Sequence, residues 1–188
     1  MQFAERKAGD LAAEVKTLAD LLAVGESDLW PPMIDAVHVE HGYEMALGAA
    51  MGDDLSVPGD IAAPVHWDAL PPFEVTPALP QGAVALSQFV RGPAALSRRL
   101  SQIGVVDIAD GKRLQSELKP GQRLVTREGA LWRWDGYTAA ADAPTAAARR
   151  LEQRNRLADI EAQLLEARDR AAETRAAFET ARMAAEYA

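Results

Sequence analysis

The sequence contains no cysteine. Disulfide bonds, thiolate metal ligands and cysteine nucleophiles are therefore excluded, and so is a zinc hook, which joins coiled-coil arms through a Cys-x-x-Cys motif. No apolar run approaches the length that spans a bilayer, and no basic leader precedes an apolar segment. We therefore expect a soluble protein with no membrane partner, and the lack of cysteine is compatible with a reducing cytoplasm.

Lysine and arginine are absent from residues 25–75, which contain ten acidic residues. Residues 91–133 are the opposite, with nine Lys and Arg against four acids, a local balance of +5 within a chain of net charge -8. Two interpretations stay open. In the first, the two regions attract each other within one domain. In the second, they mark head-to-tail association between copies, or the basic region is a surface that binds a polyanion.

Neither glycine nor proline interrupts residues 149–188, which have the composition of a long helix. From Leu157 onward, small or apolar residues alternate at spacings of three and four, the heptad pattern of a coiled coil. They are Ile160, Leu164, Ala167, Ala171, Thr174, Phe178, Ala181 and Ala185. The N-terminal stretch repeats this spacing at Ala4, Ala8, Leu11, Val15, Leu18 and Leu22. The two terminal helices are therefore predicted to pair as an antiparallel coiled coil.

Residues between these arms are predicted to form an α+β insert of two small α/β subdomains. The expected domains are an N-terminal arm (1–24), an insert (25–145, divided into 25–80 and 81–145) and a C-terminal arm (146–188). In the first subdomain we predict strands at 34–40, 55–57 and 65–67 and a helix at 43–51. In the second we predict helices at 83–90, 94–103 and 112–118, a strand at 105–108, and a hairpin of 123–127 with 130–134.

No motif in the insert requires catalysis. Six residues separate Gly104 from Gly111 where a phosphate loop has four between its glycines, and no nucleophile elbow surrounds any serine. The metal or acid–base candidates are isolated histidines and carboxylates without a diagnostic spacing. These candidates are His38, Glu40, His41, His66, Asp53, Asp54 and Asp60. We expect no catalytic residue and no metal site, and an enzyme remains the least favoured reading.

Basic residues of the second subdomain continue into the root of the C-terminal arm, and this placement of charge predicts a phosphate-binding surface there. The candidate DNA contacts are Lys112, Arg113, Lys119, Arg123, Arg149, Arg150, Arg154 and Arg156. Trp132 and Trp134 share one face of their predicted strand. Such a pair is either core or an exposed aromatic platform for a partner or unpaired bases.

Three segments, in this order between antiparallel arms, carry a resemblance to a known family. They are Gly42–Leu55, Pro93–Val106 and Gly121–Gly129, the last reading G-Q-R-L-V-T-R-E-G. The chain resembles the hinge of SMC (structural maintenance of chromosomes) proteins, the chromosome-organising ATPases of the condensin and cohesin group. It is most similar to the bacterial chromosome-partition type. It departs from the family pattern after Gly129, where a Gly-Gly-rich tail is common and Leu131–Tyr137 stands here.

The resemblance implies a non-enzymatic hinge that homodimerises two parent molecules and contributes to sequence-independent DNA binding or entrapment in the nucleoid. It places Gly121, Val125, Thr126 and Gly129 at the dimer interface, with Trp132 and Trp134 replacing glycine-mediated contacts. ATP and Mg²⁺ would bind to heads that this sequence does not contain, and other condensin subunits would be reached only through those heads. No cofactor is expected here.

A different class of function is also open. The chain could be a coiled-coil adaptor whose central domain binds a protein partner and has no DNA role. The acidic region 25–75 and Trp30 would then form the contact surface.

Overall fold

The computed structural model describes residues 2–23, 30–141 and 146–187, which fall into two compact units. We call them the arm unit (Met1–Gly25 with Gln153–Ala188) and the central unit (Glu26–Glu152). No helix of the described residues is long and apolar enough to cross a membrane.

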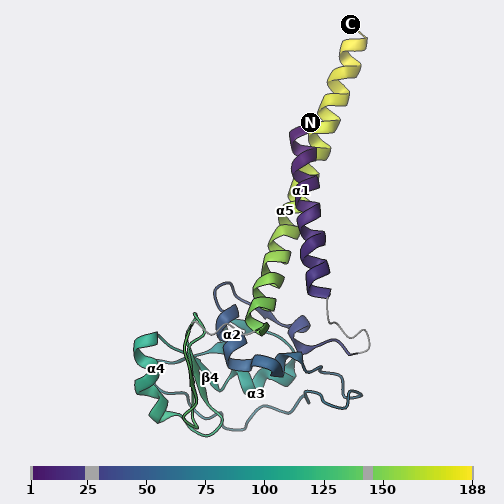
Figure 1. Cartoon of the computed structure of the whole chain (residues 1–188). Coiled ribbons are helices and arrows are strands. Elements are labelled where there is room, and N and C mark those ends of the chain that lie inside the picture. The colour runs from purple at the N-terminus through teal and green to yellow at the C-terminus, as the bar shows by residue number, and fades with distance from the viewer. Residues whose placement is uncertain (1, 24–29, 142–145, 188) are drawn as a thin grey trace. The chain divides into compact units, whose positions relative to one another are not determined.

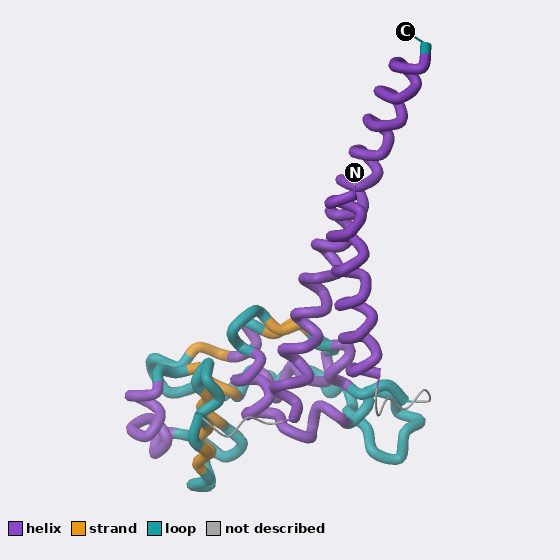
Figure 2. The backbone as a smooth tube through the Cα atoms, turned by 45° about the horizontal axis from the view of Figure 1, so that its top comes forward, coloured by secondary structure: helices purple, strands orange, loops and turns teal. Residues whose placement is uncertain are grey.

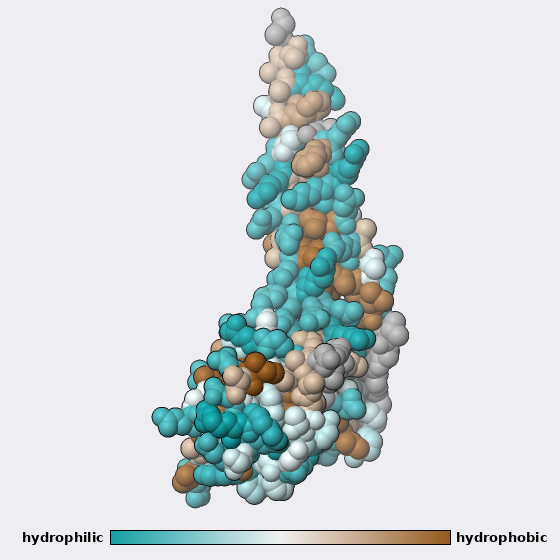
Figure 3. All heavy atoms as spheres, turned by 60° about the vertical axis from the view of Figure 1, so that its left-hand side comes forward, coloured by the Kyte–Doolittle hydropathy of each residue, from teal (hydrophilic) through white to brown (hydrophobic). Residues whose placement is uncertain are grey.

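The arm unit consists of α1 (Gln2–Ala23) and the greater part of α5 (Ala146–Glu186), which run side by side and antiparallel (Figures 1 and 2). Leu22, Ile160, Leu164 and Ala167 are buried, and the remaining predicted seam positions of α1 are half-buried. Figure 3 shows apolar side chains along the middle of the arm between polar flanks. An ion pair of 2.6 Å joins Arg156 Nη2 to Glu14 Oε1. The predicted antiparallel pairing is confirmed.

The central unit contains a five-stranded sheet of order β2-β4-β5-β6-β7. Its strands are β2 (Val84–Ala85), β4 (Ile103–Val105), β5 (Arg123–Val125), β6 (Leu131–Arg133) and β7 (Thr138–Ala139). Only β4 and β5 are parallel, and α4 (Ile108–Leu114) with the 3₁₀ turn η5 (Gln115–Glu117) connects them. The predicted hairpin of β5 and β6 is confirmed, and its turn contains Gly129 at φ +89°, a conformation that favours glycine.

The rest of the central unit is less regular. It contains η1 (Met33–Ala36), β1 (His38–Val39), α2 (Glu44–Met51), η2 (Gly52–Ser56), η3 (Leu86–Gln88), β3 (Val90–Arg91), η4 (Ala94–Leu96) and α3 (Ser97–Leu100). Strands β1 and β3 form a separate antiparallel pair. The predicted helix 43–51 and the helical stretch beginning near residue 112 are confirmed, although the second starts earlier, at Ile108.

Several predicted elements are wrong. Residues 83–90 form β2, η3 and the start of β3 rather than a helix, because Val84 and Ala85 pair with β4 and Val90 pairs with β1. The predicted strand 55–57 is mostly the end of η2, which turns Leu55 into the core, and 65–67 contains no strand. Strand 34–40 shortens to β1, and strand 105–108 moves to 103–105. Helix 94–103 shortens to η4 followed directly by α3, which ends at Leu100, because Ile103 already pairs within the sheet.

Side chains of the sheet alternate between two hydrophobic clusters. Val125 and Leu131 point toward α2 and join a large cluster that also contains Leu47 and Leu151. On the other face, Trp132 belongs to a smaller cluster of buried side chains, which α4 covers. Figure 1 shows α4 and α2 on opposite sides of the strands. The large cluster contains residues of both predicted subdomains. The boundary between the subdomains at residue 80 therefore stays a prediction.

Helix α5 begins inside the central unit, where its first residues pack closely on α2. A Cβ atom added to Gly48 would lie 2.5 Å from the Cα of Ala148, which is far inside van der Waals contact. Ala148 and Leu151 are almost completely buried. Glycine at position 48 therefore permits this close approach of α5 to α2.

Candidate functional site

Three arginines of the basic second half reach back to the first half. Arg99 Nη2 lies 3.0 Å from Asp54 Oδ2, Arg127 donates to the Tyr43 hydroxyl at 2.5 Å, and Arg123 donates to the carbonyl of Ala50. The Arg127 guanidinium also lies 4.5 Å from the centre of the Tyr43 ring, which stacks on Phe89 at 3.9 Å. Part of the attraction between the acidic region 25–75 and the basic region 91–133 is thus formed between side chains of the same domain.

Arg123 differs from the other predicted DNA contacts because its side chain turns inward against the end of α2. Burial lowers the pKa of the Arg123 guanidinium, and repulsion from Arg99 and Arg133 lowers it further. The alternation of β5 explains this placement, because Arg123 and Val125 share the face that α2 covers. Its hydrogen bond to the Ala50 carbonyl, near the end of α2, connects β5 to that helix.

The other candidate cations belong to several elements. Lys112, Arg113 and Lys119 are exposed on or just after α4 and η5, and Arg113 pairs with Asp110 at 2.6 Å and Glu117 at 3.8 Å. Arg149 is exposed on α5, whereas Arg150 is partly buried with Nη2 3.3 Å from Asp35 Oδ1. Arg154 and Arg156 belong to the arm unit.

Most of the predicted dimer-interface residues lie within the chain's own core. Val125, Thr126 and Trp132 are buried, and the Thr126 hydroxyl accepts the N–H of Ala130 at 3.2 Å. Trp132 lies flat on α4, where a Cβ on Gly111 would be 2.3 Å from its ring. These side chains form the scaffold of the hairpin, so any role in association is through the surface that they support.

Gly121 and Trp134 are exposed, in contrast to the rest of that set. Gly121 adopts φ +89° in the turn before β5, and the Trp134 N–H donates to Gln122 O at 3.3 Å, so the two lie at one end of the hairpin. Trp134 is 47% exposed whereas Trp132 is 6% exposed. The two tryptophans therefore do not form a shared exposed platform, because β6 ends at Arg133.

An apolar groove beside the edge strand β2 was not predicted. Its cavity volume is ≈ 700 Å³, and we call it the β2 groove. Residues of both halves line it, namely Tyr43, Gly82, Val84, Phe89, Val105, Val106, Asp107, Ile108, Ala109, Arg127 and Glu128. Val84 is 40% exposed and Ile108 61% exposed, although both are apolar. An edge strand next to exposed apolar side chains is a template for pairing with another chain.

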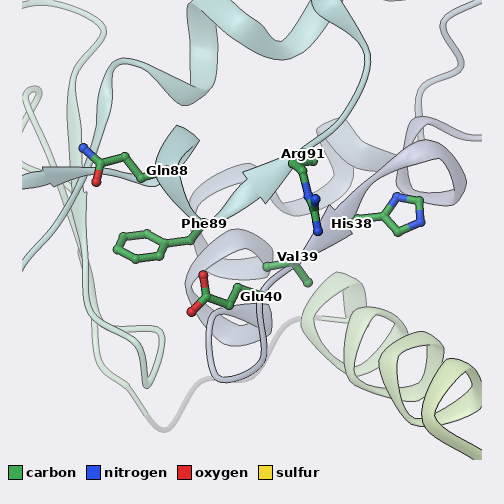
Figure 4. A pocket seen from close by; sticks show the side chains of 6 residues that line it. All are labelled: His38, Val39, Glu40, Gln88, Phe89 and Arg91. Carbon is green, nitrogen blue, oxygen red and sulfur yellow. The ribbon is translucent and has the colours of Figure 1, made fainter.

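A smaller pocket of ≈ 320 Å³ lies at the β1–β3 pair and contains two of the candidate metal ligands, His38 and Glu40. Figure 4 shows their side chains pointing away from each other, with Val39 between them. His41 instead lies 3.6 Å from Glu44. Across the described ranges, no three His, Cys, Asp or Glu side chains are grouped so that they could hold a metal ion.

Two curated proteins are similar to the chain along most of its length. A chromosome partition protein Smc of Rhodopseudomonas palustris is 50% identical over 178 residues, which cover 95% of this chain. The protein of the same name from Cereibacter sphaeroides is 49% identical over 156 residues, or 82% of this chain. The chain spans only 15% and 14% of the lengths of these relatives. No family model matches it.

The fold also has a counterpart among solved structures. The SMC hinge domain of Geobacillus stearothermophilus, crystallised as an asymmetric dimer, superposes with a TM-score of 0.70 at 17% identity. The superposition covers 95% of this chain and 91% of that one. The fold is therefore that of an SMC hinge domain with its flanking coiled-coil helices. Within that class, the chain belongs to the bacterial chromosome partition Smc family.

Proposed function

We propose that this hinge domain homodimerises and thereby joins two copies of a longer chromosome partition protein. The observation that carries the proposal is the β2 groove, which exposes Val84 and Ile108 beside an unpaired strand edge. Apolar side chains gain about 25 cal/mol per Å² when they leave water, so a second copy covering this groove is favoured. The crystallised dimer of the Geobacillus stearothermophilus hinge supports the same reading.

The test is molar mass by light scattering across a concentration series. The wild-type chain is expected at twice the monomer mass, and Ile108→Asp is expected at the monomer mass because it places a charge in an apolar contact. The matched control is Ile61→Asp, which alters an apolar residue, 75% exposed, outside the β2 groove. A dimer that survives Ile108→Asp would place the interface elsewhere, and a wild-type monomer would overturn the proposal.

We further propose that exposed cations on and just after α4, together with Arg149 on α5, contact DNA phosphates without reading sequence. Among the candidates, Lys112, Lys119 and Arg149 are exposed, and the Lys112 ammonium is held only by Gln115 at 3.3 Å in the described region. This narrows the predicted set, because Arg123 and Arg150 take part in contacts inside the central unit. ATP hydrolysis is proposed for the heads of a full-length parent and not for this domain.

Duplex binding measured against salt concentration tests the DNA contact. Each phosphate contact adds about 0.9 to the slope of log affinity against log salt, so Lys112→Ala with Lys119→Ala should lower that slope by about 2. The control pair is Lys7→Ala with Lys16→Ala, which removes the same charge from exposed positions of α1. Equal slopes for the two pairs would remove α4 from the contact surface.

A further inference from the structure

Residues 57–83 form a long excursion between η2 and β2 that contains no helix or strand and six prolines. Its only ladder contact is an isolated bridge between Pro58 and Pro32. Loops longer than about 12–15 residues without secondary structure are uncommon in compact domains and are usually functional or linkers. The contacts of this excursion distinguish the two cases.

Hydrogen bonds hold the excursion at several points. The Trp67 indole N–H donates to Asp54 O at 2.8 Å, and the Trp67 backbone N–H donates to Pro58 O at 2.8 Å. Near its end, two buried glutamines of the sheet region bind its carbonyls. Gln102 donates to Pro77 O at 3.2 Å, and Gln122 donates to Ala78 O at 3.0 Å. A segment fixed by buried side chains has a defined shape and is not a linker.

This fixed segment nevertheless exposes apolar side chains. Ile61 is 75% exposed, Val65 65% and Leu70 53%. Next to them lies a second groove, with a cavity volume of ≈ 690 Å³, which we call the proline groove. It is lined by Pro31, Pro32, Met33, Asp35, Ala36, Gly59, Asp60, Ile61, Trp67, Asp68, Ala69, Pro93, Ala94 and Ala95. Exposed apolar surface held in a fixed shape marks an interaction site.

The charges around the proline groove define the chemistry of what binds there. Three carboxylates line it, and no lysine or arginine does. Asp35 is paired with Arg150 at 3.3 Å, but no ion pair engages Asp60 or Asp68 anywhere in the described part of the chain. Two uncompensated carboxylates repel the phosphates of a nucleic acid or an anionic membrane and attract a cation.

We propose that the proline groove binds a peptide segment of a partner protein in which apolar side chains alternate with Lys or Arg. The apolar side chains lie against Trp67, Met33 and the prolines, and the cations face Asp60 and Asp68. This surface differs from the β2 groove, with which it shares no lining residue. The partner peptide and a second copy at the β2 groove therefore do not compete for the same residues.

The absence of cysteine makes a direct binding test possible. Ala94 is exposed and lines the groove, so Ala94→Cys accepts one environment-sensitive dye at a known position. The probe is an acetylated nine-residue peptide of alternating Lys and Leu, and its counterpart carries Glu in place of Lys. The Lys peptide is expected to change the dye emission saturably, and the Glu peptide to bind at least about tenfold more weakly. A dye on Ser116→Cys, outside the groove, should not respond.

Charge removal then tests the groove itself. Asp60→Asn with Asp68→Asn is expected to weaken the Lys peptide about tenfold, because each carboxylate loses its attraction for a lysine. The control, Asp53→Asn with Glu74→Gln, removes two exposed acids of the same region that do not line the groove, and should leave binding unchanged. The proposal is overturned if neither peptide saturates the dye, if both bind equally, or if the two double variants behave alike.

Light scattering on the same variants separates this proposal from dimerisation. Asp60→Asn with Asp68→Asn should keep the wild-type molar mass, while Ile108→Asp should keep peptide binding at the Ala94→Cys dye. If the groove variant instead alters the molar mass, a second copy of the chain occupies the proline groove and the partner peptide is rejected.

Discussion

Helices α1 and α5 of the arm unit bury only a few side chains, chiefly Leu22, Ile160 and Leu164, and their other surfaces are solvated. The central unit instead encloses a continuous apolar cluster, reached even by Leu151 of α5, with the sheet packed on both faces. One region depends on a narrow seam that repeats along two helices, the other on close packing among short elements. The same substitution should therefore have different consequences in the two regions.

Matched leucine truncations give the largest expected contrast. Leu47→Ala, at a fully buried site of the central unit, should cost about 3 kcal/mol, because the enclosed cavity cannot collapse. Leu164→Ala in the arm should cost about 1 kcal/mol, since solvent and neighbouring side chains reach the seam. All four tryptophans lie between residues 30 and 134, so their fluorescence reports only on the central unit, whereas circular dichroism at 222 nm is weighted toward the arm.

Urea unfolding followed by both signals makes the comparison. Leu47→Ala should lower the fluorescence midpoint strongly, and Leu164→Ala should mainly shift the dichroism. Coincident transitions that move together in both variants would show that the arm and the central unit unfold as one.

Glycine-to-alanine replacements should differ in sign between the regions. Gly48→Ala should destabilise the central unit by about 2 kcal/mol, because the new methyl group would meet the backbone of Ala148. Gly9→Ala should stabilise α1 by about 0.8 kcal/mol, since nothing lies within 4 Å of the added atom and alanine is the better helix former. Thermal unfolding followed at 222 nm checks Gly9→Ala and thermal unfolding followed by tryptophan fluorescence checks Gly48→Ala, and a stabilised Gly48→Ala would show that α5 is not packed on α2 in this way.

The sequence predicted the regions with strong local signals. The heptad seam, the hairpin around Gly129 and the helix after Tyr43 each follow from a repeating pattern or a turn residue. The helix predicted for 83–90 is wrong. Leu86 and Val90 lie four residues apart, which is the spacing of one helical face, but both are buried in a segment that forms a strand, a 3₁₀ turn and a second strand. Short elements whose form is set by tertiary contacts carry no such local signal.

The candidate site was harder to predict than the fold. The alternation of β5 gives Arg123 and Leu124 opposite faces, but only the packing of α2 shows that the arginine face is covered. Trp132 and Trp134 fit one strand face until the strand ends at Arg133. Val84 and Ile108 are far apart in the sequence, and their groove exists only because β2 and the start of α4 meet in space.

A surface ion pair of the arm should contribute little. Arg156 and Glu14 lie 2.6 Å apart but are 67% and 40% exposed, so water screens most of their attraction. Arg156→Ala should cost at most about 0.5 kcal/mol, and the loss should vanish in about 1 M salt. The double-mutant cycle with Glu14→Ala, followed at 222 nm, isolates the pair. A coupling that persists at high salt would mean that the seam, and not the charge, requires these side chains.

The smallest effect is expected at the β6–β7 turn of the central unit, and it depends on pH. Burial alone raises the pKa of the Asp135 carboxyl, but hydrogen bonds from Arg133 at 2.5 Å and from the Tyr137 N–H outweigh it and hold that pKa below its ordinary value. A lowered folded-state pKa stabilises the fold above the ordinary value of about 4, and this contribution is lost as the pH falls through the folded-state pKa.

Asp135→Asn, which keeps an acceptor for Tyr137 but removes the charge, should therefore be less stable than wild type at pH 7 and equal to it in strong acid. Tryptophan fluorescence during urea unfolding at pH 7, 4 and 2.5 measures the difference, with the adjacent Trp134 as a local reporter. Glu74→Gln, an exposed acid that lines neither groove, controls for the loss of one negative charge. A difference that stays constant over this pH range would show that Asp135 acts through the shape of the turn and not through its ionised carboxylate.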